Sequence, residues 1–323
     1  MNIRNTKLLR ALNQELQKFE QRCKQIIGER IHFWALGDVP EVFEIGKGIR
    51  PALHFFFCKA LNSISEINFT YAMLSEMLHF ATLVHDDVLD EALLRRLDGT
   101  LKATYGNLKA ILIGDLILAT CYKIASSLKN TRFLQLLSDT SYKLCKGEIL
   151  QHNEKYNFNI TTQKYLEIIY NKTAVLFGFS CSLADFEGKY YKLLYDIGTK
   201  IGIMYQIIDD FLDIVANEKI IGKSIGRDIS KGSITLPLIL LFQIANEREK
   251  NIIKEKLLNK NNNIMDYLRN VINKYQIKHR IYYYVEHIYE NIEELARHIL
   301  AKKSFDDFKD FLNYLLNYIK STG

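Results

Sequence analysis

The sequence predicts an all-α protein, a single large bundle of antiparallel helices around a central cavity. Three observations lead to this prediction. Apolar residues recur with helical spacing along most of the 323 residues, strand-like alternation is scarce, and each of the three prolines stands where a helix can begin. Since no Gly/Ser-rich linker divides the chain, we expect one domain spanning residues 1–323.

Two stretches show the helical pattern most clearly. Residues 71–90 are apolar nearly all round, which predicts a helix buried at the centre of the bundle. Near the end of the chain, apolar side chains step by three and four positions along one face of an amphipathic helix. They are Ile281, Val285, Ile288, Ile292, Leu295 and Ile299. The connections are short and polar, as at residues 259–263.

Composition and charge limit the class of function. Hydrophobic residues make up 48% and charged residues 25%, which is ordinary for a soluble globular protein. The net charge of +6 suits an anionic substrate or an anionic membrane surface. No basic stripe with interleaved aromatic residues is present, so nucleic acid is not an expected partner.

Cysteine usage indicates a reducing compartment, and we expect a cytoplasmic protein. The five cysteines are odd in number, widely spaced and without a CxxC pair, which favours reduced thiols. Residues 1–21 lack the unbroken apolar run of a signal peptide. The most apolar stretch, residues 234–245, is too short to cross a membrane and contains Pro237.

Two Asp-Asp-x-x-Asp motifs stand beside apolar residues. The first is Asp86, Asp87 and Asp90, and the second is Asp209, Asp210 and Asp213. On a helix, the first and last aspartates of each motif project from one face, one turn apart. One such motif could be a solvated acidic face, but two on apolar helices favour a metal site. Because all the ligands are oxygens, Mg²⁺ bound together with a diphosphate is the natural expectation.

Basic residues lie close to these motifs in the chain. Arg95 and Arg96 follow the first motif, and Lys47 and Arg50 precede the helix start expected at Pro51. Lys172 stands beside Thr173 in an apolar stretch, where an unpaired lysine is costly. The alternative interpretations are a surface arginine pair for residues 95–96 and a lysine that reaches to the surface at position 172.

Together these residues resemble the trans-isoprenyl diphosphate synthases, which make farnesyl, geranylgeranyl and longer polyprenyl diphosphates. The likeness runs from about Gly46 to Pro237 and includes Glu76 and His79 ahead of the first aspartates. The matching segments, in order, are "GKGIRP", "SEMLHFATLVHDD", "YGNLKAILIGDLILA", "GEILQ", "NKTAVLFGFSC", "YQIIDDFLD" and "GKSIGRDISKGSITLP". The chain departs from the family pattern at Gly48, usually arginine, and at Ser233, usually lysine. Whether Lys231 compensates for Ser233 is left open.

This resemblance implies an isoprenoid-synthase fold and a Mg²⁺-dependent condensation of an allylic diphosphate with isopentenyl diphosphate. Asp86 and Asp90 would bind two Mg²⁺ and Asp209 a third, and the other aspartates would support them. The ligands of the allylic diphosphate would be Arg95, Lys172 and Lys223. Those of isopentenyl diphosphate would be Lys47, Arg50, His79 and Arg96. Thr173 and Gln206 would face the developing allylic cation, and Gln151 would lie near the metals. The family also implies a homodimer. Its long apolar product suggests transient contact with a membrane.

Product length should depend on the side chains below the first motif. One turn below Asp86 stand Ala81 and Thr82, with Leu78 and Leu74 further along the same face as Ala81. None of these is aromatic, so we expect a long product of about six to eight isoprenes, of the kind that serves as a quinone side chain. Phe133 and Leu137 are candidates for the floor of the tunnel, and the alternative is that both are plain core.

Other interpretations remain open at this point. One is a shorter-chain synthase that makes geranylgeranyl or farnesyl diphosphate. Another is a non-catalytic subunit of a heteromeric synthase, although such subunits typically lose an aspartate motif. A terpenoid cyclase or a calcium-binding scaffold fits the two complete motifs and the basic residues less well. His85, beside the first motif, is expected to have a structural role.

Overall fold

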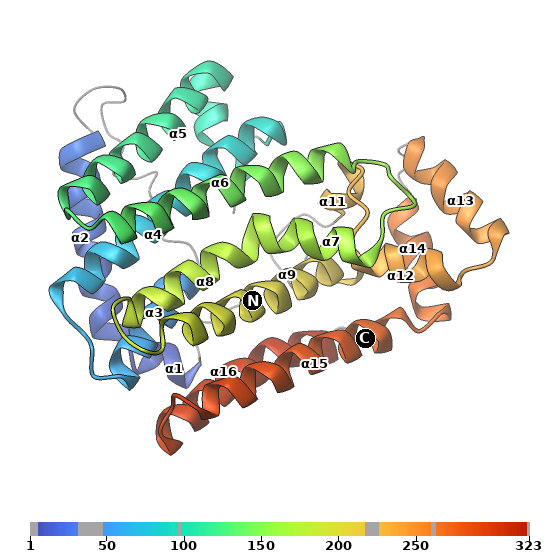
Figure 1. Ribbon diagram of the computed structural model, residues 1–323. Helices are drawn as coiled ribbons and strands as arrows, with labels where there is room; N and C mark the ends of the chain where they lie inside the picture. Colours follow the sequence, from blue (N-terminus) through green and yellow to red (C-terminus); the bar gives the residue numbers. More distant parts are fainter. Residues whose placement is uncertain are drawn as a thin grey trace.

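The computed structural model describes residues 6–31, 48–92, 94–95, 98–216, 226–259 and 263–321. Helices dominate these residues, so the all-α prediction is confirmed (Figure 1). A two-stranded antiparallel hairpin, β1 (Leu94–Arg95) with β2 (Asp98–Gly99), interrupts them. The helices in the first part of the chain are α1 (Lys7–Arg10), α2 (Asn13–Ile31), α3 (Ile49–Ala60), α4 (Glu66–Leu89), α5 (Leu101–Ser127), α6 (Thr131–Asn153) and α7 (Thr162–Ile169).

The second part of the chain continues the bundle and adds a C-terminal hairpin (Figure 1). It begins with the π-helix η3 (Tyr170–Ala174), α8 (Val175–Ser182), the 3₁₀-helix η4 (Leu183–Asp185) and α9 (Tyr191–Val215). It ends with α11 (Arg227–Ser230), α12 (Leu236–Ile244), α13 (Glu247–Leu258), α14 (Ile264–Lys274), α15 (Ile277–Arg297) and α16 (Lys302–Ser321).

Helix α4 is the buried central helix that the sequence predicts. It starts at a cap in which Asn68 Oδ1 accepts hydrogen bonds from the Ser65 backbone N–H and the Ser65 hydroxyl, at 2.8 and 2.7 Å. Its middle is surrounded by α3, α5 and α8. The helix ends at Leu89, so the first aspartate motif occupies its last turn.

Helices α8 and α9 pack closely because glycines remove side chains at the contact. A Cβ atom at Gly198 would lie 2.5 Å from the Phe177 carbonyl oxygen, and one at Gly202 would lie 2.6 Å from Ala174 Cα. Such distances exclude any larger residue without movement of the backbone. This close packing fixes α9, whose last turns carry the second aspartate motif.

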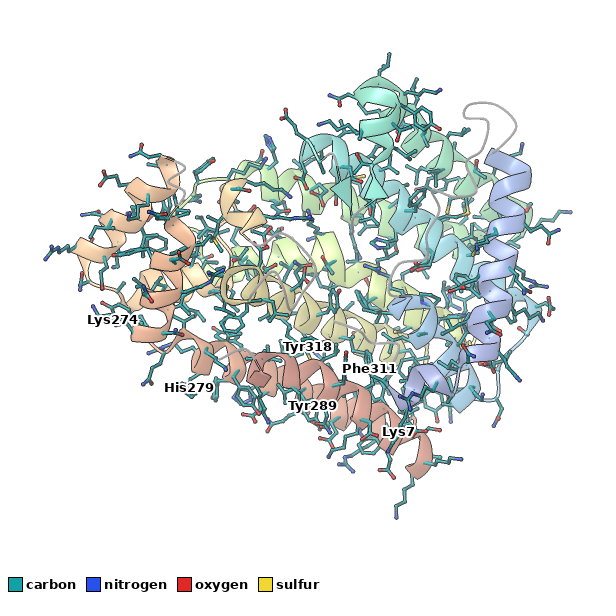
Figure 2. The ribbon with its side chains drawn as sticks, turned by 180° about the vertical axis from the view of Figure 1, so that it is seen from behind. Lys7, Lys274, His279, Tyr289, Phe311 and Tyr318 are labelled. Carbon is teal, nitrogen blue, oxygen red and sulfur yellow. The ribbon has the colours of Figure 1, made fainter. Side chains whose placement is uncertain are left out.

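The C-terminal helices cover one side of the bundle (Figures 1 and 2). The predicted apolar stripe lies in α15, where Ile281, Val285 and Ile292 are fully buried, while Ile288 and Leu295 lie at its margin. Tyr289 faces the core from the same helix, and Phe311 does so from α16 (Figure 2). Lys7 of α1 forms an ion pair with Asp310 at 2.9 Å and joins the N-terminal segment to α16.

All five cysteines are free, as expected, and only Cys145 is exposed. Among the described residues, no helix is both long enough and apolar enough to cross a membrane. Two proline positions agree with the prediction of helix starts, since Pro51 lies in the first turn of α3 and Pro237 in the first turn of α12. The third, Pro40, lies outside the described residues.

Candidate active site

Both aspartate motifs lie at the C-terminal ends of their helices. The first occupies the last turn of α4, where Asp87 is buried and Asp90 is the C-terminal cap. The second occupies the last two turns of α9, where Asp210 is only 3% exposed. The C-terminus of a helix carries partial negative charge, which disfavours carboxylates and favours cations. Two such ends with six acidic side chains therefore require positive charge nearby.

Asp210 is held by two hydrogen bonds, one from helix α7 and one from its own helix, α9. The Tyr165 hydroxyl of α7 donates to Oδ2 at 2.7 Å, and Gln206 Nε2 donates to Oδ1 at 2.6 Å. Gln206 in turn accepts a hydrogen bond from the Thr173 hydroxyl at 2.8 Å. Burial, with the nearby charge of Asp228, raises the pKa of Asp210 well above its usual range although these two hydrogen bonds oppose the shift. This carboxylate is thus fixed in position while its charge remains uncompensated.

A fourth acidic residue, Asp228 of α11, lies beside the three aspartates of the second motif. Its backbone N–H donates to Asp213 Oδ2 at 3.1 Å, which ties α11 to the end of α9. Burial, followed by the charge of Asp213, raises the pKa of Asp228 to about 7, while Lys231 and Lys172 act in the opposite direction. Asp209 raises the pKa values of Asp210, Asp213 and Asp228, so its carboxylate lies close to all three.

Arg269 of α14 caps the end of α9. Its Nε donates to the Ile214 carbonyl at 3.1 Å, and its Nη2 donates to the Ala216 carbonyl at 3.3 Å. These carbonyls belong to the group at a helix C-terminus that lacks partners within the helix. The planar guanidinium fork can satisfy both at once. Arg269 therefore fixes the turn that follows the second aspartate motif.

Lys172 lies within electrostatic reach of both motifs. Its Nζ is 2.6 Å from Glu148 Oε1 and donates to Gln151 Oε1 at 2.7 Å. Burial opposes the charge of Lys172, but Asp86, Glu148 and Asp90 together outweigh burial and raise its pKa. Lys172 also lowers the pKa of Asp228 on the opposite side. The lysine is therefore paired, and the alternative of a lysine that only reaches to the surface is wrong.

The local backbone explains how Lys172 reaches this position. Residues 170–174 form one turn of π-helix, and such turns occur frequently at functional sites. Helix α6 approaches this turn closely because residue 147 is glycine, where a Cβ atom would lie 2.4 Å from the Lys172 backbone nitrogen. The approach brings Glu148 and Gln151, one turn apart on α6, onto the ammonium group.

Lys231 joins the two motifs directly. Its Nζ lies 2.6 Å from Asp90 Oδ2, across 141 positions of sequence. The lysine follows α11, whose Asp228 belongs to the second acidic group. Lys172 and Lys231 thus both act on the first motif and on Asp228 beside the second.

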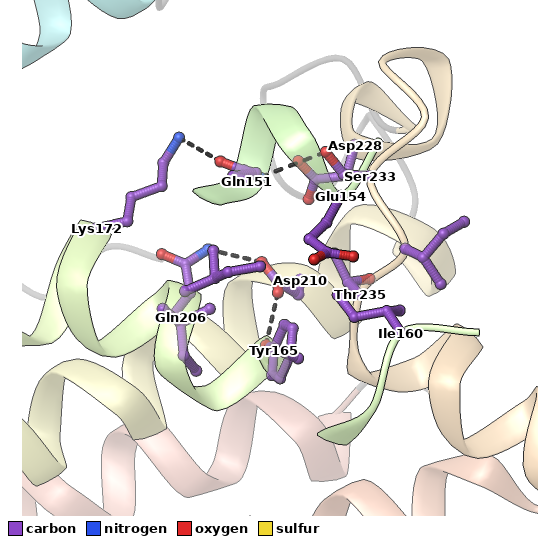
Figure 3. Close-up of a pocket in the computed structure, with 13 residues that line it drawn as sticks. Gln151, Glu154, Ile160, Tyr165, Lys172, Gln206, Asp210, Asp228, Ser233 and Thr235 are labelled. Carbon is purple, nitrogen blue, oxygen red and sulfur yellow. Dashed lines mark hydrogen bonds between the residues drawn. The ribbon is translucent and has the colours of Figure 1, made fainter. Parts of the chain in front are cut away.

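A pocket enclosing about 540 Å³, part of it open to solvent, lies beside the second motif (Figure 3). Lys172, Gln206 and Asp210 line it from the helices, and Asp228 and Ser233 line it from the segment that follows α9. The Gln151 amide spans this pocket, since it accepts from Lys172 and donates to the Ser233 hydroxyl at 3.3 Å (Figure 3). Its lining combines one lysine, amides and hydroxyls with the carboxylates of Glu154, Asp210 and Asp228, so an anionic group would need a cation beside these acids.

Arg50 lies at the start of α3, away from the acidic groups of α9. Its guanidinium carbon is 4.6 Å from the centre of the Phe177 ring, and its buried Nε has no hydrogen-bond partner. Burial lowers the pKa of Arg50, while Glu76 acts in the opposite direction. A buried N–H without an acceptor is costly, so this donor suits a phosphate oxygen. His79 lies on α4, seven residues before Asp86, on the same side of the helix.

Some predicted site residues lie outside the described residues. These are Lys47, Arg96 and Lys223. Arg95 belongs to β1. Within the part of the chain that the structure describes, no three His, Cys, Asp or Glu side chains are grouped so that they could hold a metal ion by themselves. An ion at either motif would therefore take further ligands from water or from a phosphate.

The side chains predicted to set product length form one stripe of α4. Ala81, Leu78 and Leu74 are each at most 2% exposed and lie within about 60° of one another around the helix. Helix α5 lies close to this part of α4, since Cys121 Sγ of α5 donates to the Leu74 carbonyl at 3.6 Å. Thr82 lies on a different side and donates to the His79 carbonyl at 2.7 Å.

An aromatic cluster lies beyond Leu74. The ring of Tyr71, on α4, stacks on Phe133 of α6 with 4.7 Å between centroids, and Phe186 packs edge-on against both. Phe133 and Leu137 are fully buried. His85, at the opposite end of the stripe, has Nε2 3.3 Å from both the Ile111 carbonyl and Asp115 Oδ1, in keeping with the expected structural role.

Sequence reasoning missed several residues of this site. Glu148 lies within "GEILQ", three residues before Gln151, and helical spacing could have placed both on one face. Asp228 is a single acidic residue after a polar stretch, with no local signal. Tyr165 and Arg269 come from helices remote in sequence, and only the fold brings them to α9.

Comparison with known proteins identifies the family. The sequence matches the polyprenyl synthetase family over residues 40–275. The chain belongs to this family of prenyltransferases. It is 35% identical over 249 residues to component 2 of heptaprenyl diphosphate synthase from Bacillus subtilis, across 75% of this chain and 70% of that protein. It is 37% identical over 198 residues to octaprenyl diphosphate synthase from Escherichia coli, across 60% of this chain and 61% of that protein.

Solved structures of the family share the fold. A decaprenyl diphosphate synthase from Rhodobacter capsulatus superposes with a TM-score of 0.87 at 24% identity, over 97% of this chain and 98% of that one. A polyprenyl synthase from Caulobacter crescentus, complexed with calcium and isoprenyl diphosphate, gives a TM-score of 0.84 at 23% identity, over 96% of each chain. The predicted isoprenoid-synthase fold is therefore confirmed.

Proposed function

We propose that this member of the polyprenyl synthetase family is a long-chain polyprenyl diphosphate synthase that requires Mg²⁺. It would condense an allylic diphosphate with isopentenyl diphosphate and repeat the step to give an all-trans chain. The observation that carries the proposal is the meeting of two complete aspartate motifs at two helix C-termini, with Lys172 acting on both. Such an arrangement has the charge needed to bind divalent ions together with a diphosphate.

The residues of both motifs fit Mg²⁺ as the bound ion. All the donors are carboxylate oxygens, and the pKa values of Asp210 and Asp213 are raised first by burial and then by neighbouring aspartates, whose charge a divalent ion would neutralise. We assign Asp86 and Asp90 to two ions and Asp209 to a third. Ions held there stabilise negative charge on the departing diphosphate. The Caulobacter polyprenyl synthase, which shares the fold, was complexed with calcium and isoprenyl diphosphate.

The protein's own groups would hold and orient the substrates. Lys172, fixed by Glu148 and Gln151, presents a cation to the allylic diphosphate. Arg50 offers its unpartnered Nε to the diphosphate of the second substrate. The Thr173 hydroxyl donates a hydrogen bond to Gln206 Oε1 at 2.8 Å, and Gln206 lines the pocket of Figure 3. These oxygens can stabilise an adjacent positive charge.

The names of the relatives support a long product. The two curated relatives named above make heptaprenyl and octaprenyl diphosphate by name, and a third, at 35% identity, is an all-trans-nonaprenyl-diphosphate synthase from Rhodobacter capsulatus. The aromatic cluster of Tyr71, Phe133 and Phe186 would form the floor. It begins fifteen residues before Asp86, about 22 Å along the helix, or about four extended isoprene units. A chain of six to eight units would have to lie bent in the tunnel.

An exposed apolar face on α5 and α6 would join two copies of this chain. It consists of Leu108, Ile111 and Leu112 on α5, with Tyr142 and Ile149 on α6, and these residues are 40–75% exposed. The two helices are consecutive and in contact, so the five side chains gather on neighbouring helices. A contiguous apolar face of this kind marks an interaction site. A membrane, or a different subunit as the "component 2" of the Bacillus relative hints, are the other possible occupants.

Sedimentation distinguishes these occupants. Leu112→Asp combined with Ile149→Asp should convert a dimer of the purified chain to a monomer. The control, Leu258→Asp, changes a residue that is 59% exposed on the remote helix α13 and should leave the dimer intact. A monomeric unmodified chain that binds lipid vesicles would contradict the dimer and favour the membrane.

A single domain over residues 1–323 and a cytoplasmic location also remain predictions.

Incubation with substrates tests the proposed activity. The purified chain receives farnesyl diphosphate, isotope-labelled isopentenyl diphosphate and Mg²⁺, and the products are analysed by mass spectrometry. We expect all-trans chains of about six to eight isoprenes, and none when a chelator replaces Mg²⁺. Products of three or four isoprenes would favour a shorter-chain synthase. Absence of any product would favour the non-catalytic subunit.

A further inference from the structure

The segment after α11 is held rigidly and carries Lys231. Gly232 has φ of +76°, and its carbonyl accepts a hydrogen bond from the Tyr156 backbone N–H at 2.7 Å. A Cβ atom at position 232 would lie 2.5 Å from the Tyr156 ring, so only glycine fits there. On the other side, the Ser233 N–H donates to the Asp228 carbonyl at 2.9 Å. These contacts restrain the backbone on the C-terminal side of Lys231.

From this segment the side chain crosses to the first motif. Lys231 Nζ lies 2.6 Å from Asp90 Oδ2, and the two side chains are 30% and 31% exposed. This degree of burial shields the pair partly from water and salt, so its coupling exceeds that of a fully exposed pair. Lys231 also acts on Asp228, whose pKa it lowers. One ammonium group thus offsets negative charge on both acidic clusters.

Position 233 shows why this lysine matters in this chain. The family resemblance places a lysine at 233, but this chain has serine there. The Ser233 hydroxyl accepts a hydrogen bond from Gln151 Nε2 and carries no charge. The positive charge stands instead at Lys231, where it contacts a carboxylate of the first motif.

We propose that Lys231 is a positioning residue. It forms an ion pair with the Asp90 carboxylate when no divalent ion is bound there, and it competes with the ion for that carboxylate. The inference rests on the proposed function only in assigning Asp90 to a divalent ion. Before an ion and a diphosphate bind, the lysine limits repulsion between the two motifs. When they bind, the ammonium leaves Asp90. The protein therefore holds a divalent ion weakly until a diphosphate supplies further ligands.

Binding of Mn²⁺ to the substrate-free protein tests this competition. Free Mn²⁺ is measured by electron paramagnetic resonance, with Mn²⁺ as the probe in place of Mg²⁺. For Lys231→Gln we expect affinity to tighten roughly three- to tenfold, because a competing cation is removed from a half-buried site. Lys231→Arg keeps the charge and should bind Mn²⁺ like the unmodified chain. The matched control, Lys250→Gln, removes a lysine paired with Glu247 on remote α13 and should have no effect.

Thermal unfolding separates competition from a purely structural role. In a chelator, Lys231→Gln should melt at a lower temperature than the unmodified chain, since the acidic clusters lose their counter-charge. Saturating Mn²⁺ should remove that difference. An equal loss with and without Mn²⁺ would overturn the inference, because it indicates a structural bond only. Unchanged or weakened Mn²⁺ affinity in Lys231→Gln would overturn the inference as well. If pyrophosphate binding weakened while Mn²⁺ affinity stayed the same, the lysine would be a substrate ligand and the inference would likewise be overturned.

These outcomes are independent of the reaction itself. The Mn²⁺ measurement needs no substrate, so it can succeed if the chain proves to be a non-catalytic subunit. Conversely, normal turnover by the unmodified chain together with unchanged Mn²⁺ affinity in Lys231→Gln would leave the proposed function intact and overturn only the role of Lys231.

Discussion

Phenylalanine placed at successive positions of the α4 stripe should block the growing product at different depths and so change its length. Ala81, Leu78 and Leu74 lie five, eight and twelve residues before Asp86. At a rise of about 1.5 Å per residue, they stand about 7.5, 12 and 18 Å below that aspartate along the axis. Successive positions therefore differ by about 4.5 and 6 Å, and one isoprene unit is close to one helical turn of about 5.4 Å.

The expected result is an ordered series of products. Ala81→Phe should give the shortest chain, Leu78→Phe a chain about one isoprene longer, and Leu74→Phe about one longer again. All three sites are at most 2% exposed, so each added ring should lower the free energy of unfolding by about 1–3 kcal/mol through overpacking. Melting temperatures measured beside the assay therefore show whether the fold survives each change.

The product length of each variant is measured by chromatography of radiolabelled products after the allylic starter has been fully consumed. The control is Ala119→Phe, which adds the same ring at an exposed position of the adjacent helix α5 and should leave product length unchanged. Identical product lengths in the three folded variants would refute the assignment of this stripe. A series in a different order would show that the product runs along another face of α4.

Other predictions concern the floor, the metal motif, the α9 cap and acid stability. Phe133→Ala should lengthen the product and cost about 3–5 kcal/mol of stability, measured by mass spectrometry and denaturant unfolding. Asp209→Ala should cut turnover by orders of magnitude with an unchanged circular dichroism spectrum, and near-normal Mg²⁺-dependent turnover would contradict the metal role. Arg269→Ala should lower the free energy of unfolding by about 1–2 kcal/mol, with little recovery in Arg269→Lys because one ammonium cannot bond both carbonyls in the same way. Burial lowers the pKa of His54 to about 4 in the folded chain. As pH falls below about 6.5, the unfolded chain therefore takes up a proton that the folded chain does not. The free energy of unfolding should decline by about 3 kcal/mol between about pH 6.5 and pH 4. Denaturant titrations should show a smaller loss in His54→Gln over that range, and an equal loss would contradict this account.

The bundle and the aspartate helices could be predicted because their signals are local. The apolar surround of residues 71–90 requires burial, and the spacing of the stripe in α15 allows only one helical face to pack. The same spacing places Asp86 beside Asp90. These features follow from the period of the helix and need no knowledge of distant contacts.

The groups that neutralise and orient the aspartates could not be predicted in the same way. Lys231 meets Asp90 across 141 positions, and Arg269 reaches α9 from a helix more than fifty residues later. The π-turn at residues 170–174 and the approach of Gly147 depend on tertiary packing, which periodicity does not encode. The sequence left open whether Lys231 compensates for Ser233, and only the geometry gives that lysine a partner.

The central claim is that both aspartate motifs hold one diphosphate through divalent ions. Anomalous diffraction from crystals soaked with Mn²⁺ and a non-hydrolysable allylic diphosphate analogue tests it most directly. We expect Mn²⁺ peaks within bonding distance of Asp86, Asp90 and Asp209, with the diphosphate between them and Lys172 in contact with its oxygens. Peaks at only one motif, or a diphosphate bound away from both, would contradict the claim.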